Sequence, residues 1–533
     1  MEFKLTRKYI IVRFFILAFL LIGSNCTSSP PDVSITKPTV TPTPPLQQSS
    51  TPTIQPIRQL TPTNEPQVED TATPAVKPQD NGDVITPVQK ERLYQASLKY
   101  IATNEVDAIK IARGMNFVHN DGHPASMCGP LSIAILMDAG LMEKYMDLHE
   151  FWELNPRPGY NENTMKTFFP EDRYLWLTNS TPINKIDYKE FPLKAGDFIY
   201  LFAGNGGNFD HIITVSRVDS MGRAYSVSNL NTPSGYIISE VLLYDPNQPG
   251  TGMFYDWTNR KYKRLGLTGL GGFQLWRLKV PIKDKTPREI KLAENIDATL
   301  TKYGGKWNVL IKKIDGEVLY SRRAYEKIHP ASAIKVPIAM LFFKALEENG
   351  VENYSEFLSQ HGVDQRTFMD ALHAMLVYSE EPATTSITNW TADQIHIDSV
   401  ILGWGIKSTT FTPRRSTLID LAKFYEGLYN GNLVSNAARE TIFAFLEEYT
   451  PNDDTRLGVI RKYFSPQDHI FLKRGSIIIN PLDVGDVAII TRGDEAYMVE
   501  IFGFQGKEET LTTFENLEKA IEEVAMVFWE YIQ

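Results

Sequence analysis

The sequence predicts a multidomain protein in which an α+β region is followed by an α/β region, with a non-globular segment before both. Three observations carry this prediction. The chain has 533 residues, which is too many for one hydrophobic core. Residues 27–88 are rich in proline and poor in large apolar residues. Residues 285–533 have strand patterns toward both ends and helical patterns between these strands, an order typical of one antiparallel sheet flanked by helices, with a helical lobe inserted.

The composition excludes some function classes. Hydrophobic residues make up 42% and charged residues 22% of the chain, as in ordinary globular domains. The formal net charge of −10 leaves no basic excess to neutralise phosphates, so we expect no nucleic-acid partner. No strand, glycine loop and helix unit for phosphate binding and no convincing set of metal ligands stands out, so we expect neither cofactor nor metal.

The N-terminus has the pattern of an export signal. Basic residues precede the apolar run Phe14–Gly23, which is too short to cross a bilayer comfortably. The run ends at Cys26 in a sequence that resembles a bacterial lipobox, although Asn25 stands where a small residue is usual. The resemblance implies a signal peptide over residues 1–26, lipidation of Cys26 and an extracytoplasmic protein anchored to the membrane. Plain secretion and an uncleaved anchor are the alternatives.

Residues 27–88 have the composition of a disordered linker. Thirteen of the 32 prolines lie between Pro30 and Pro87, many of them after threonine. Such a segment cannot bury enough apolar surface to fold. Because no glycine occurs from Thr27 to Asn81, the prolines make this stretch a stiff spacer of at most ~3 Å per residue. We therefore expect it to hold the folded regions away from the membrane.

Residues 89–282 contain a reactive-cysteine pattern. A helical stretch, Val88–Arg113, precedes Cys128-Gly129-Pro130, with which an apolar helix begins. Proline is favoured in the first turn of a helix, so Cys128 is predicted at a helix N-terminus. The helix dipole there favours the thiolate, the reactive form of cysteine. Since the only other cysteine is Cys26, we expect no disulfide within the mature chain.

A histidine and an amide complete this pattern further along the chain. His211 opens a strand of alternating apolar residues, and the next strand of the predicted hairpin ends at Asn229. Cysteine, histidine and an orienting amide form a nucleophile, a base and a group that positions the base. The alternative is that Cys128 and His211 are only well-packed structural residues.

Met127-Cys128-Gly129-Pro130 with a downstream strand that begins at histidine resembles papain-like cysteine peptidases of the bacteriocin-leader-processing type. The resemblance implies a papain-like α+β domain over residues 89–282, with Cys128 as nucleophile and His211 as base. It gives the orienting role to Asn229, with Asn231 as the less favoured choice. Gly122 stands where these enzymes carry an oxyanion-stabilising glutamine, which leaves the oxyanion partner open.

Residues 285–533 show a clear order of elements. A helix is predicted over Pro287–Tyr303, and Asp315-Gly316 is a strong signal for a hairpin between two strands. Predicted helices fill the middle of the region. Three strands, Phe471–Ile479, Val484–Thr491 and Ala496–Phe504, and a long amphipathic helix, Leu511–Tyr531, complete the region.

Ser332 and Lys335 begin a helix in this region. Residues three apart lie on one face of a helix, so the Lys335 amine can reach the Ser332 hydroxyl. A serine beside a buried amine is an activated nucleophile. The alternative is an ordinary helix start followed by an exposed lysine.

Three motifs in this order resemble those of penicilloyl serine transferases, the class A β-lactamases and the penicillin-binding D,D-peptidases. The residues are Ser332 and Lys335, then Ser379-Glu380-Glu381, then Lys473-Arg474-Gly475-Ser476, and Thr409–Pro413 resembles the segment after the omega loop of these enzymes. The resemblance implies a β-lactamase-like fold over residues 285–533.

The resemblance also implies a role for each residue. Ser332 attacks a carbonyl, Lys335 is the base or proton relay, and Ser379 passes the proton to the leaving nitrogen. Lys473 holds the substrate carboxylate. The backbone N–H groups of Ser332 and Ser476 form the oxyanion hole, beside Gly475. Glu381 occupies the substrate-binding position.

Two departures bear on activity. Glu381 stands where these enzymes have asparagine, and an ionised carboxylate cannot donate the hydrogen bond that the amide gives to the substrate. Residues 382–411 contain no glutamate, the residue with which class A β-lactamases activate the deacylating water. We therefore expect acylation of Ser332 with slow release.

Together these patterns predict an exported serine hydrolase that acts on β-lactams or D-alanyl peptidoglycan peptides, with a second, cysteine-peptidase-like domain for peptide substrates. The alternative is a catalytically impaired protein that uses both folds to recognise cell-wall or other peptides. A covalent penicillin adduct separates the two.

Overall fold

The computed structural model describes residues 83–115, 127–144, 148–151, 162–233, 235–261, 266–448, 454–477, 483–505 and 512–533. The predicted signal peptide, Cys26, nearly all of the predicted linker and Gly122 lie outside these residues. We call residues 83–282 the N-terminal region and residues 285–533 the C-terminal region. None of the described helices has the length and apolarity that a bilayer crossing requires.

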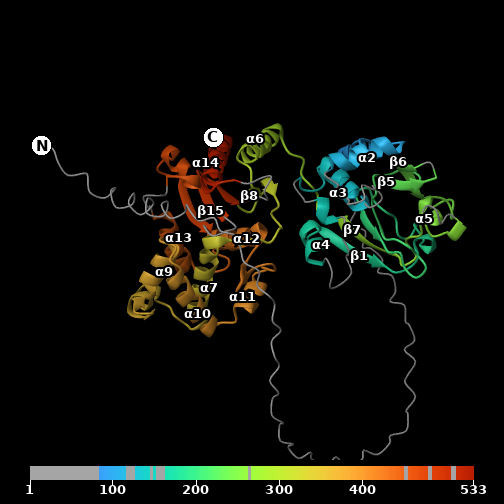
Figure 1. The fold of residues 1–533 in the computed structure, drawn as a ribbon. Helices are drawn as coiled ribbons and strands as arrows, with labels where there is room; N and C mark the ends of the chain where they lie inside the picture. The colour runs from blue at the N-terminus through green and yellow to red at the C-terminus, as the bar shows by residue number, and fades with distance from the viewer. Residues whose placement is uncertain are drawn as a thin grey trace, which may run out of the picture. The chain divides into compact units, whose positions relative to one another are not determined.

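The N-terminal region combines short helices with two antiparallel sheets (Figure 1). Its helices are α1 (Pro87–Leu98), α2 (Glu105–Gly114), α3 (Cys128–Asp138), α4 (Glu162–Phe168) and α5 (Met253–Asp256), with single 3-10 turns η2 (Leu148–Phe151) and η3 (Ile183–Lys185). Its strands are β1 (Tyr174–Asn179), β2 (Phe198–Leu201), β3 (His211–Thr214), β4 (Arg217–Val218), β5 (Ala224–Thr232), β6 (Gly235–Tyr244) and β7 (Phe273–Leu278).

The two sheets have the strand orders β1-β7-β2-β3 and β4-β5-β6. Helix α3 packs on strand β3, and the Thr214 hydroxyl donates a hydrogen bond of 3.0 Å to the Ser132 carbonyl. All apolar residues from Leu131 to Leu136 on α3 are buried, which explains why this helix is hydrophobic on every side.

The predicted helix Val88–Arg113 is wrong in one respect, because the structure has two helices there. Helix α1 ends at Leu98, and Asn104 caps the N-terminus of α2 by accepting a hydrogen bond from the Asp107 backbone. Asparagine is among the strongest N-cap residues. Asn104 therefore starts a second helix in the stretch where the apolar pattern had predicted a single one.

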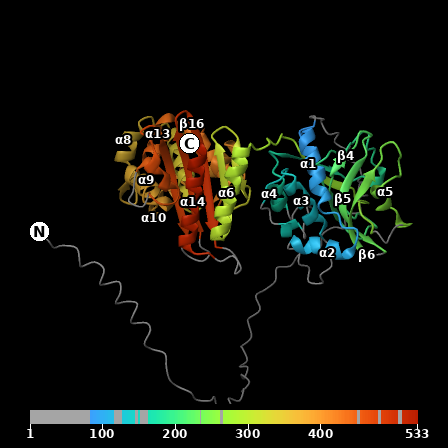
Figure 2. The same cartoon turned by 90° about the horizontal axis from the view of Figure 1, so that it is seen from above.

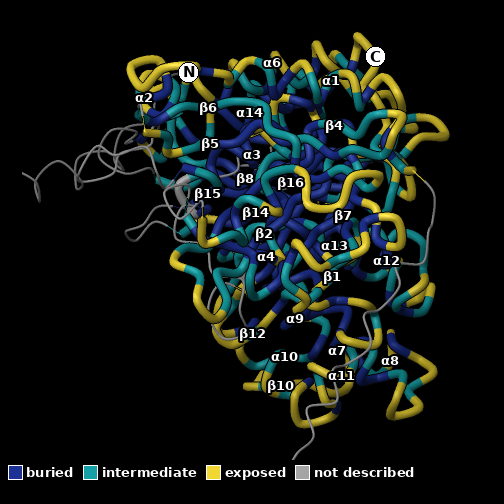
Figure 3. Tube along the Cα trace, turned by 90° about the vertical axis from the view of Figure 1, so that its right-hand side faces the viewer, coloured by how far each residue is buried: buried dark blue, intermediate teal, exposed yellow. Residues whose placement is uncertain are grey.

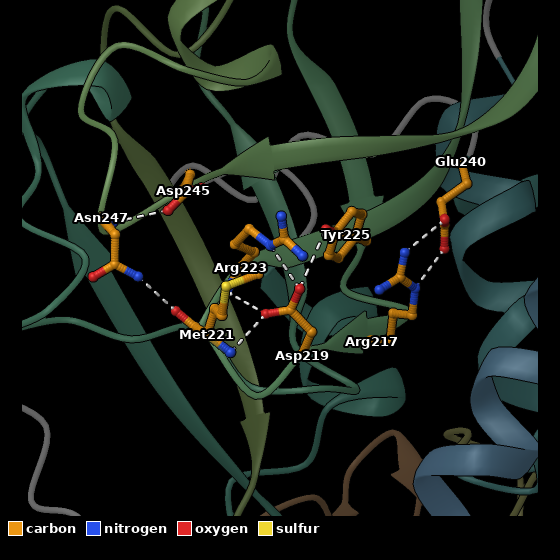
Figure 4. A network of polar contacts seen from close by, with 8 residues as sticks. All are labelled: Arg217, Asp219, Met221, Arg223, Tyr225, Glu240, Asp245 and Asn247. Atoms are coloured by element: carbon orange, nitrogen blue, oxygen red, sulfur yellow. Dashed lines mark hydrogen bonds and ion pairs between the residues drawn. The ribbon is translucent and has the colours of Figure 1, made fainter.

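A network of polar contacts joins strands β4 and β6 across the central strand β5 of this sheet (Figure 4). The Arg217 guanidinium on β4 makes two hydrogen bonds of 2.8 Å to the Glu240 carboxylate on β6 and lies 3.5 Å from the Tyr225 ring centroid. In the β4–β5 turn, Asp219 accepts bonds from Arg223 and from the backbone of Met221. A bidentate pair held against an aromatic face orients the strands more strongly than a single exposed ion pair does.

The C-terminal region contains one five-stranded antiparallel sheet and a helical lobe. Its strands are β8 (Lys306–Lys313), β9 (Val318–Arg322), β14 (His469–Ile477), β15 (Asp483–Arg492) and β16 (Glu495–Phe504), with two-residue strands β10 (Gly362–Val363), β11 (Arg366–Thr367), β12 (Thr410–Phe411) and β13 (Arg414–Arg415). Its helices are α6 (Pro287–Tyr303), α7 (Lys335–Glu348), α8 (Tyr354–Gln360), α9 (Phe368–Leu376), α10 (Glu381–Gln394), α11 (Ile397–Gly403), α12 (Leu418–Tyr429), α13 (Asn436–Glu447) and α14 (Phe514–Ile532), with 3-10 turns η5 (Ala331–Ile334) and η6 (Arg456–Tyr463).

The strand order β14-β15-β16-β8-β9 confirms that early and late strands close one sheet. Strand β16 pairs with β8 from Tyr497 opposite Lys313 to Phe504 opposite Lys306. Helices α6 and α14 lie together on one face of this sheet (Figure 2). Their apolar sides pack with Trp307, Val309 and the other residues of that face into one core.

The opposite face of the sheet packs against the lobe that carries the candidate site. Met498 and Phe502 on β16 belong to the same core as α7, α9 and α12. Strands β15 and β16 are buried along most of their length, and Figure 3 colours the tube by this burial. The first turn of α7 therefore lies between a rigid sheet and a packed lobe, which restricts how its side chains can move.

Candidate active site

Ser332 lies in the turn η5, directly before α7 and against strand β14. Ala331 has a positive φ of 46°, which a residue with a side chain seldom adopts. Gly475 on β14 permits the close approach of this strand, because a Cβ there would lie 2.9 Å from the Ser332 backbone nitrogen. The nucleophile predicted from the sequence is therefore held in a strained turn beside the strand that carries Lys473 and Ser476.

Lys335 is the first residue of α7, and its side chain is fully buried. Its amine donates a hydrogen bond of 2.6 Å to the Ser379 carbonyl and lies 2.7 Å from the Glu381 carboxylate. Burial lowers the pKa of Lys335, while the hydrogen bond that Lys335 donates to Glu381 opposes that shift. Among the described residues, no hydrogen bond joins the amine to the Ser332 hydroxyl.

Glu381 bridges two cations. It begins α10, and its other oxygen lies 2.9 Å from the Arg414 guanidinium on β13. Burial raises the pKa of Glu381, but hydrogen bonds from Arg414 and Lys335 outweigh it and hold the pKa below its ordinary value. Glu381 is therefore an ionised carboxylate, as the sequence prediction assumed, and its partners are side chains of the protein itself.

Ser379 and Lys473 form the second half of the site. The Lys473 amine donates to the Ser379 hydroxyl and, at 2.7 Å, to the Leu376 carbonyl. Ser379 has a positive φ of 58°, a second strained position beside Ser332. Lys473 is 3% exposed, so its charge is directed into the site rather than to bulk solvent. Such a cation next to a hydroxyl suits proton transfer and the binding of a carboxylate.

One cleft joins these groups. Its volume is about 640 Å³, and its lining includes six residues that the sequence motifs singled out: Ser332, Ser379, Glu381, Lys473, Gly475 and Ser476. Lys335 lies behind this lining, beneath Glu381 and Ser379. The structure thus brings together all seven serine-hydrolase residues predicted from the sequence.

Arg456 is a residue of the cleft that the motifs did not predict. It is 3% exposed, donates to the Ser476 hydroxyl at 3.0 Å and to the Gly475 carbonyl at 3.0 Å, and pairs with Asp486 on β15. Arg456 has a positive φ of 55° at the start of η6. No motif precedes it, so only a long-range contact could reveal it. Arg456 and Lys473 together make this end of the cleft cationic.

The acids that line the cleft do not come from the segment where a deacylating glutamate was sought. Among the described lining residues these acids are Glu381, Glu448 and Glu518, and none of the lining residues belongs to 382–411. Glu448 lies 2.9 Å from the His373 ring. Burial raises the pKa of Glu518, which makes it a more basic carboxylate.

Cys128 lies at the start of a helix as predicted, but the pKa of its thiol is shifted in the direction opposite to the prediction. Cys128 begins α3 and is a free thiol of intermediate exposure. Burial raises the pKa of this thiol, whereas the helix terminus alone predicts a lowered one. Desolvation outweighs the dipole because the residues around Cys128 belong mainly to an apolar core.

The residue that holds His211 is Ser228, which corrects the prediction that Asn229 orients this ring. His211 Nε2 lies 2.9 Å from the Ser228 hydroxyl, and the ring packs edge-on against Trp257 at 4.9 Å. Asn229 lies on the same strand, opposite Ile238, and is buried. Successive residues of a strand point to opposite faces, so one position decides which of the two meets the imidazole. Burial lowers the pKa of His211 to about 3, so the ring is neutral at physiological pH.

No metal centre emerges from the described residues, which contain no cluster of three or more histidine, cysteine, aspartate or glutamate side chains suited to an ion.

Comparison with known proteins locates one family. Residues 291–532 match the model of the beta-lactamase enzyme family, Beta-lactamase2. Similar solved structures include a β-lactamase from Chitinophaga pinensis (15% identity, covering 46% of this chain and 100% of that one, TM-score 0.38) and one from Sphaerobacter thermophilus (18%, 44% and 94%, 0.37). A mutant of PBP-A in an acyl-enzyme complex with penicillin G is also similar (16%, 45% and 97%, 0.35). No protein of curated function matches the sequence.

The C-terminal region thus has a β-lactamase-like serine hydrolase fold, because the family match spans its sheet, its lobe and every residue of the cleft. The match begins at residue 291 and so does not reach the N-terminal region. The papain-like interpretation of residues 89–282 stays a prediction.

Proposed function

We propose that the C-terminal region is a serine acyl-transfer enzyme in which Ser332 forms an acyl-enzyme with β-lactams or with wall peptides that end in D-alanine. One observation carries the proposal. A single cleft is lined by the strained Ser332 turn, by the Ser379 hydroxyl held on Lys473, and by the Gly475–Ser476 backbone, with Lys335 buried directly behind. This combination provides a nucleophile, a base, a proton path and an oxyanion site.

In the proposed reaction, Ser332 Oγ forms a bond to the carbonyl carbon and the carbonyl C–N bond breaks. The hydroxyl proton moves to Lys335, and the leaving nitrogen takes the hydroxyl proton of Ser379. Lys473, which donates a hydrogen bond to this hydroxyl, returns a proton to Ser379, and the proton held by Lys335 then restores Lys473. Lys473 and Arg456 attract the substrate carboxylate to that end of the cleft. The backbone N–H groups of Ser332 and Ser476 stabilise the oxyanion.

Release of the acyl group is the slow step in this proposal. Hydrolysis needs a base to activate water, and residues 382–411 contribute no acid to the described lining of the cleft. Loss of a general base typically costs ~10² to 10⁴ in rate. The acyl-enzyme therefore accumulates rather than turning over quickly.

Labelling of the full-length chain with a fluorescent penicillin tests the proposal. We expect one labelled band that is lost in Ser332→Ala. A matched control is Ser359→Ala, because Ser359 is an exposed serine on α8 outside the cleft and its loss leaves labelling unchanged. Release of D-alanine from a synthetic wall peptide separates peptide substrates from β-lactams.

The second candidate is a protein that binds such ligands without reacting. The contact of Lys335 with Glu381 favours it, because a lysine held by a carboxylate is not available to Ser332. Reversible penicillin binding with no covalent adduct, in a chain that remains folded, identifies this alternative.

For the N-terminal region we propose a peptide-binding role with cysteine-peptidase ancestry. The support is that Cys128 begins α3, that His211 begins β3, and that the two elements pack together. The raised pKa of the Cys128 thiol and the low pKa of His211 favour binding over turnover. Alkylation of Cys128 in the folded chain tests which of the two holds.

We further propose that the chain is exported and is anchored to the membrane by a lipid on Cys26. The support is the sequence alone: a basic start, a short apolar run and a cysteine at its end. This location gives both folded regions access to cell-wall peptides.

A further inference from the structure

Lys335 has two polar partners, and neither of them is the nucleophile. Its amine donates a hydrogen bond of 2.6 Å to the Ser379 carbonyl and lies 2.7 Å from one Glu381 oxygen. The Ser332 hydroxyl has no hydrogen-bond partner among the described residues. A base must offer a lone pair to the proton that it accepts, so a protonated lysine paired with a carboxylate cannot serve Ser332.

Glu381 is placed to exert control over this lysine. Its side chain is 57% exposed and lines the cleft, whereas Lys335 is fully buried. An exposed carboxylate loses little solvation when it moves, so a ligand in the cleft can displace it. The second partner, Arg414 at 2.9 Å, offers Glu381 a cation to which it can shift.

We propose that Glu381 is a positioning residue that restrains Lys335, so that Ser332 is acylated slowly until this carboxylate is removed or displaced. The inference rests on the proposed acylation of Ser332. It assigns to Glu381 an effect opposite to that of a substrate-binding amide. The amide would donate a hydrogen bond to the substrate, whereas the carboxylate pairs with Lys335 and keeps this lysine from Ser332.

The charges around Lys335 come from several elements. Glu381 on α10 and Arg414 on β13 face it directly. Lys473 on β14 lies across Ser379, whose carbonyl binds Lys335 and whose hydroxyl binds Lys473. His329 lies close to Glu381 and Arg414 on the segment before Ser332. Glu381 is the one anion among these groups in the described part of the chain, so its removal leaves Lys335 facing cations.

This arrangement fixes the direction of the pH effect. Acylation needs neutral Lys335, so its rate rises with pH through the pKa of this lysine. Glu381 raises that pKa, whereas burial and Arg414 lower it. Replacement of Glu381 by a neutral side chain therefore moves the rate profile to lower pH. At neutral pH a larger fraction of the lysine is then neutral, and we expect a rate gain of roughly tenfold or more.

The experiment measures the second-order rate of penicillin acylation of the full-length chain between pH 5 and pH 10, followed by intact mass. Glu381→Gln is isosteric, and Glu381→Asn introduces a shorter amide. We expect both to react at least about tenfold faster than wild type at pH 7, with the profile moved to lower pH. A change that only loosened the fold would not shift the profile in this direction.

Glu380→Gln is the matched control. Glu380 precedes Glu381, pairs with Arg366 at 2.6 Å and does not belong to the described lining of the cleft, so we expect an unchanged rate and profile. Arg414→Gln leaves the carboxylate on Lys335 and should give no acceleration.

The outcomes separate this inference from the proposed function. If wild type and Glu381→Gln are acylated at the same rate and with the same pH profile, the restraint of Lys335 by Glu381 is overturned and the proposed function stands. Acylation of Glu381→Gln but not of wild type supports a complete restraint. Absence of any adduct in wild type and in both folded variants overturns the proposed function and this inference with it.

Discussion

Lys335 is fully buried and Cys128 is partly exposed, and desolvation changes the pKa values of these two reactive groups in opposite directions. Desolvation disfavours the charged form of each group. It lowers the pKa of Lys335, which moves the amine toward the neutral form that a base needs. It raises the pKa of Cys128, which moves the thiol away from the nucleophilic thiolate. The same physical effect therefore favours chemistry at Ser332 and opposes it at Cys128.

The thiol of Cys128 should react slowly in the folded chain. We expect iodoacetamide labelling at pH 7 to be slower than for a free cysteine, to rise as the pH passes above the ordinary thiol range, and to become fast in urea. Labelling is read by mass spectrometry in full-length protein, with Cys26→Ala as the background so that Cys128 is the sole thiol. Fast labelling at pH 6 that falls in His211→Ala would instead reveal a thiolate–imidazolium pair and an active cysteine peptidase.

The sequence predicted Asn229 as the partner of His211, whereas the structure has Ser228 in that place. This difference of one position shows the limit of predicting single contacts from the sequence. Residue types and spacing identified the strand beside His211 but not its end, because β5 continues past Asn229 to Thr232. Which of two adjacent residues faces the ring depends on a register of one position, and a slip of one reverses every side chain. Arg456 was missed because it reaches the site from a segment without a motif, and Arg414 was missed because the resembling segment Thr409–Pro413 ends one residue before it.

The turn η5 and strand β14 form the contact on which the site depends. Gly475 has no side chain, and a Cβ there would lie 2.8 Å from Ala331 Cβ and 2.9 Å from the Ser332 nitrogen. Both neighbours belong to a buried turn against the sheet, so neither can yield cheaply. The proposed oxyanion site, formed by the backbone N–H groups of Ser332 and Ser476, depends on this close approach.

Gly475→Ala should therefore damage the site more than the fold. We expect penicillin acylation to fall by roughly 10² or more, because the two oxyanion donors separate. We expect a loss of about 1–3 kcal/mol in the free energy of unfolding, from overpacking. Stopped-flow labelling and urea titration measure the two effects.

Gly403→Ala is the control for this substitution. Gly403 ends α11, does not have a positive φ and would bring a Cβ into open space, so both measurements should be unchanged. Wild-type acylation by Gly475→Ala would contradict the assigned oxyanion site.

The elements of the C-terminal region were more predictable than its contacts. The helix Pro287–Tyr303 appears with the predicted bounds, because Thr286 and Glu289 form a capping box at its start. The strands and their closure followed from apolar patterns and from the hairpin at Asp315. The pairing of Lys335 with Glu381 could not be predicted, since spacing shows that a lysine can reach a serine but not which neighbour it prefers.

At the level of the complete chain, the predicted lipid anchor tests the cellular context. We expect the wild-type protein expressed in a lipoprotein-processing bacterium to enter the detergent phase and to carry a lipid on its first residue, Cys26. Cys26→Ala should enter the aqueous phase or stay unprocessed. Equal partitioning of both cleaved proteins into water would rule out the anchor and leave plain secretion.

The intact mass of the full-length chain after incubation with benzylpenicillin tests the central claim most directly. The account predicts a stable increase equal to one whole penicillin molecule, located on the peptide that contains Ser332, and no increase in Ser332→Ala. It also predicts that the adduct persists after free penicillin is removed, since residues 382–411 contribute no acid to the described lining of the cleft. An unmodified mass at millimolar penicillin in both folded wild type and Glu381→Gln would contradict the account.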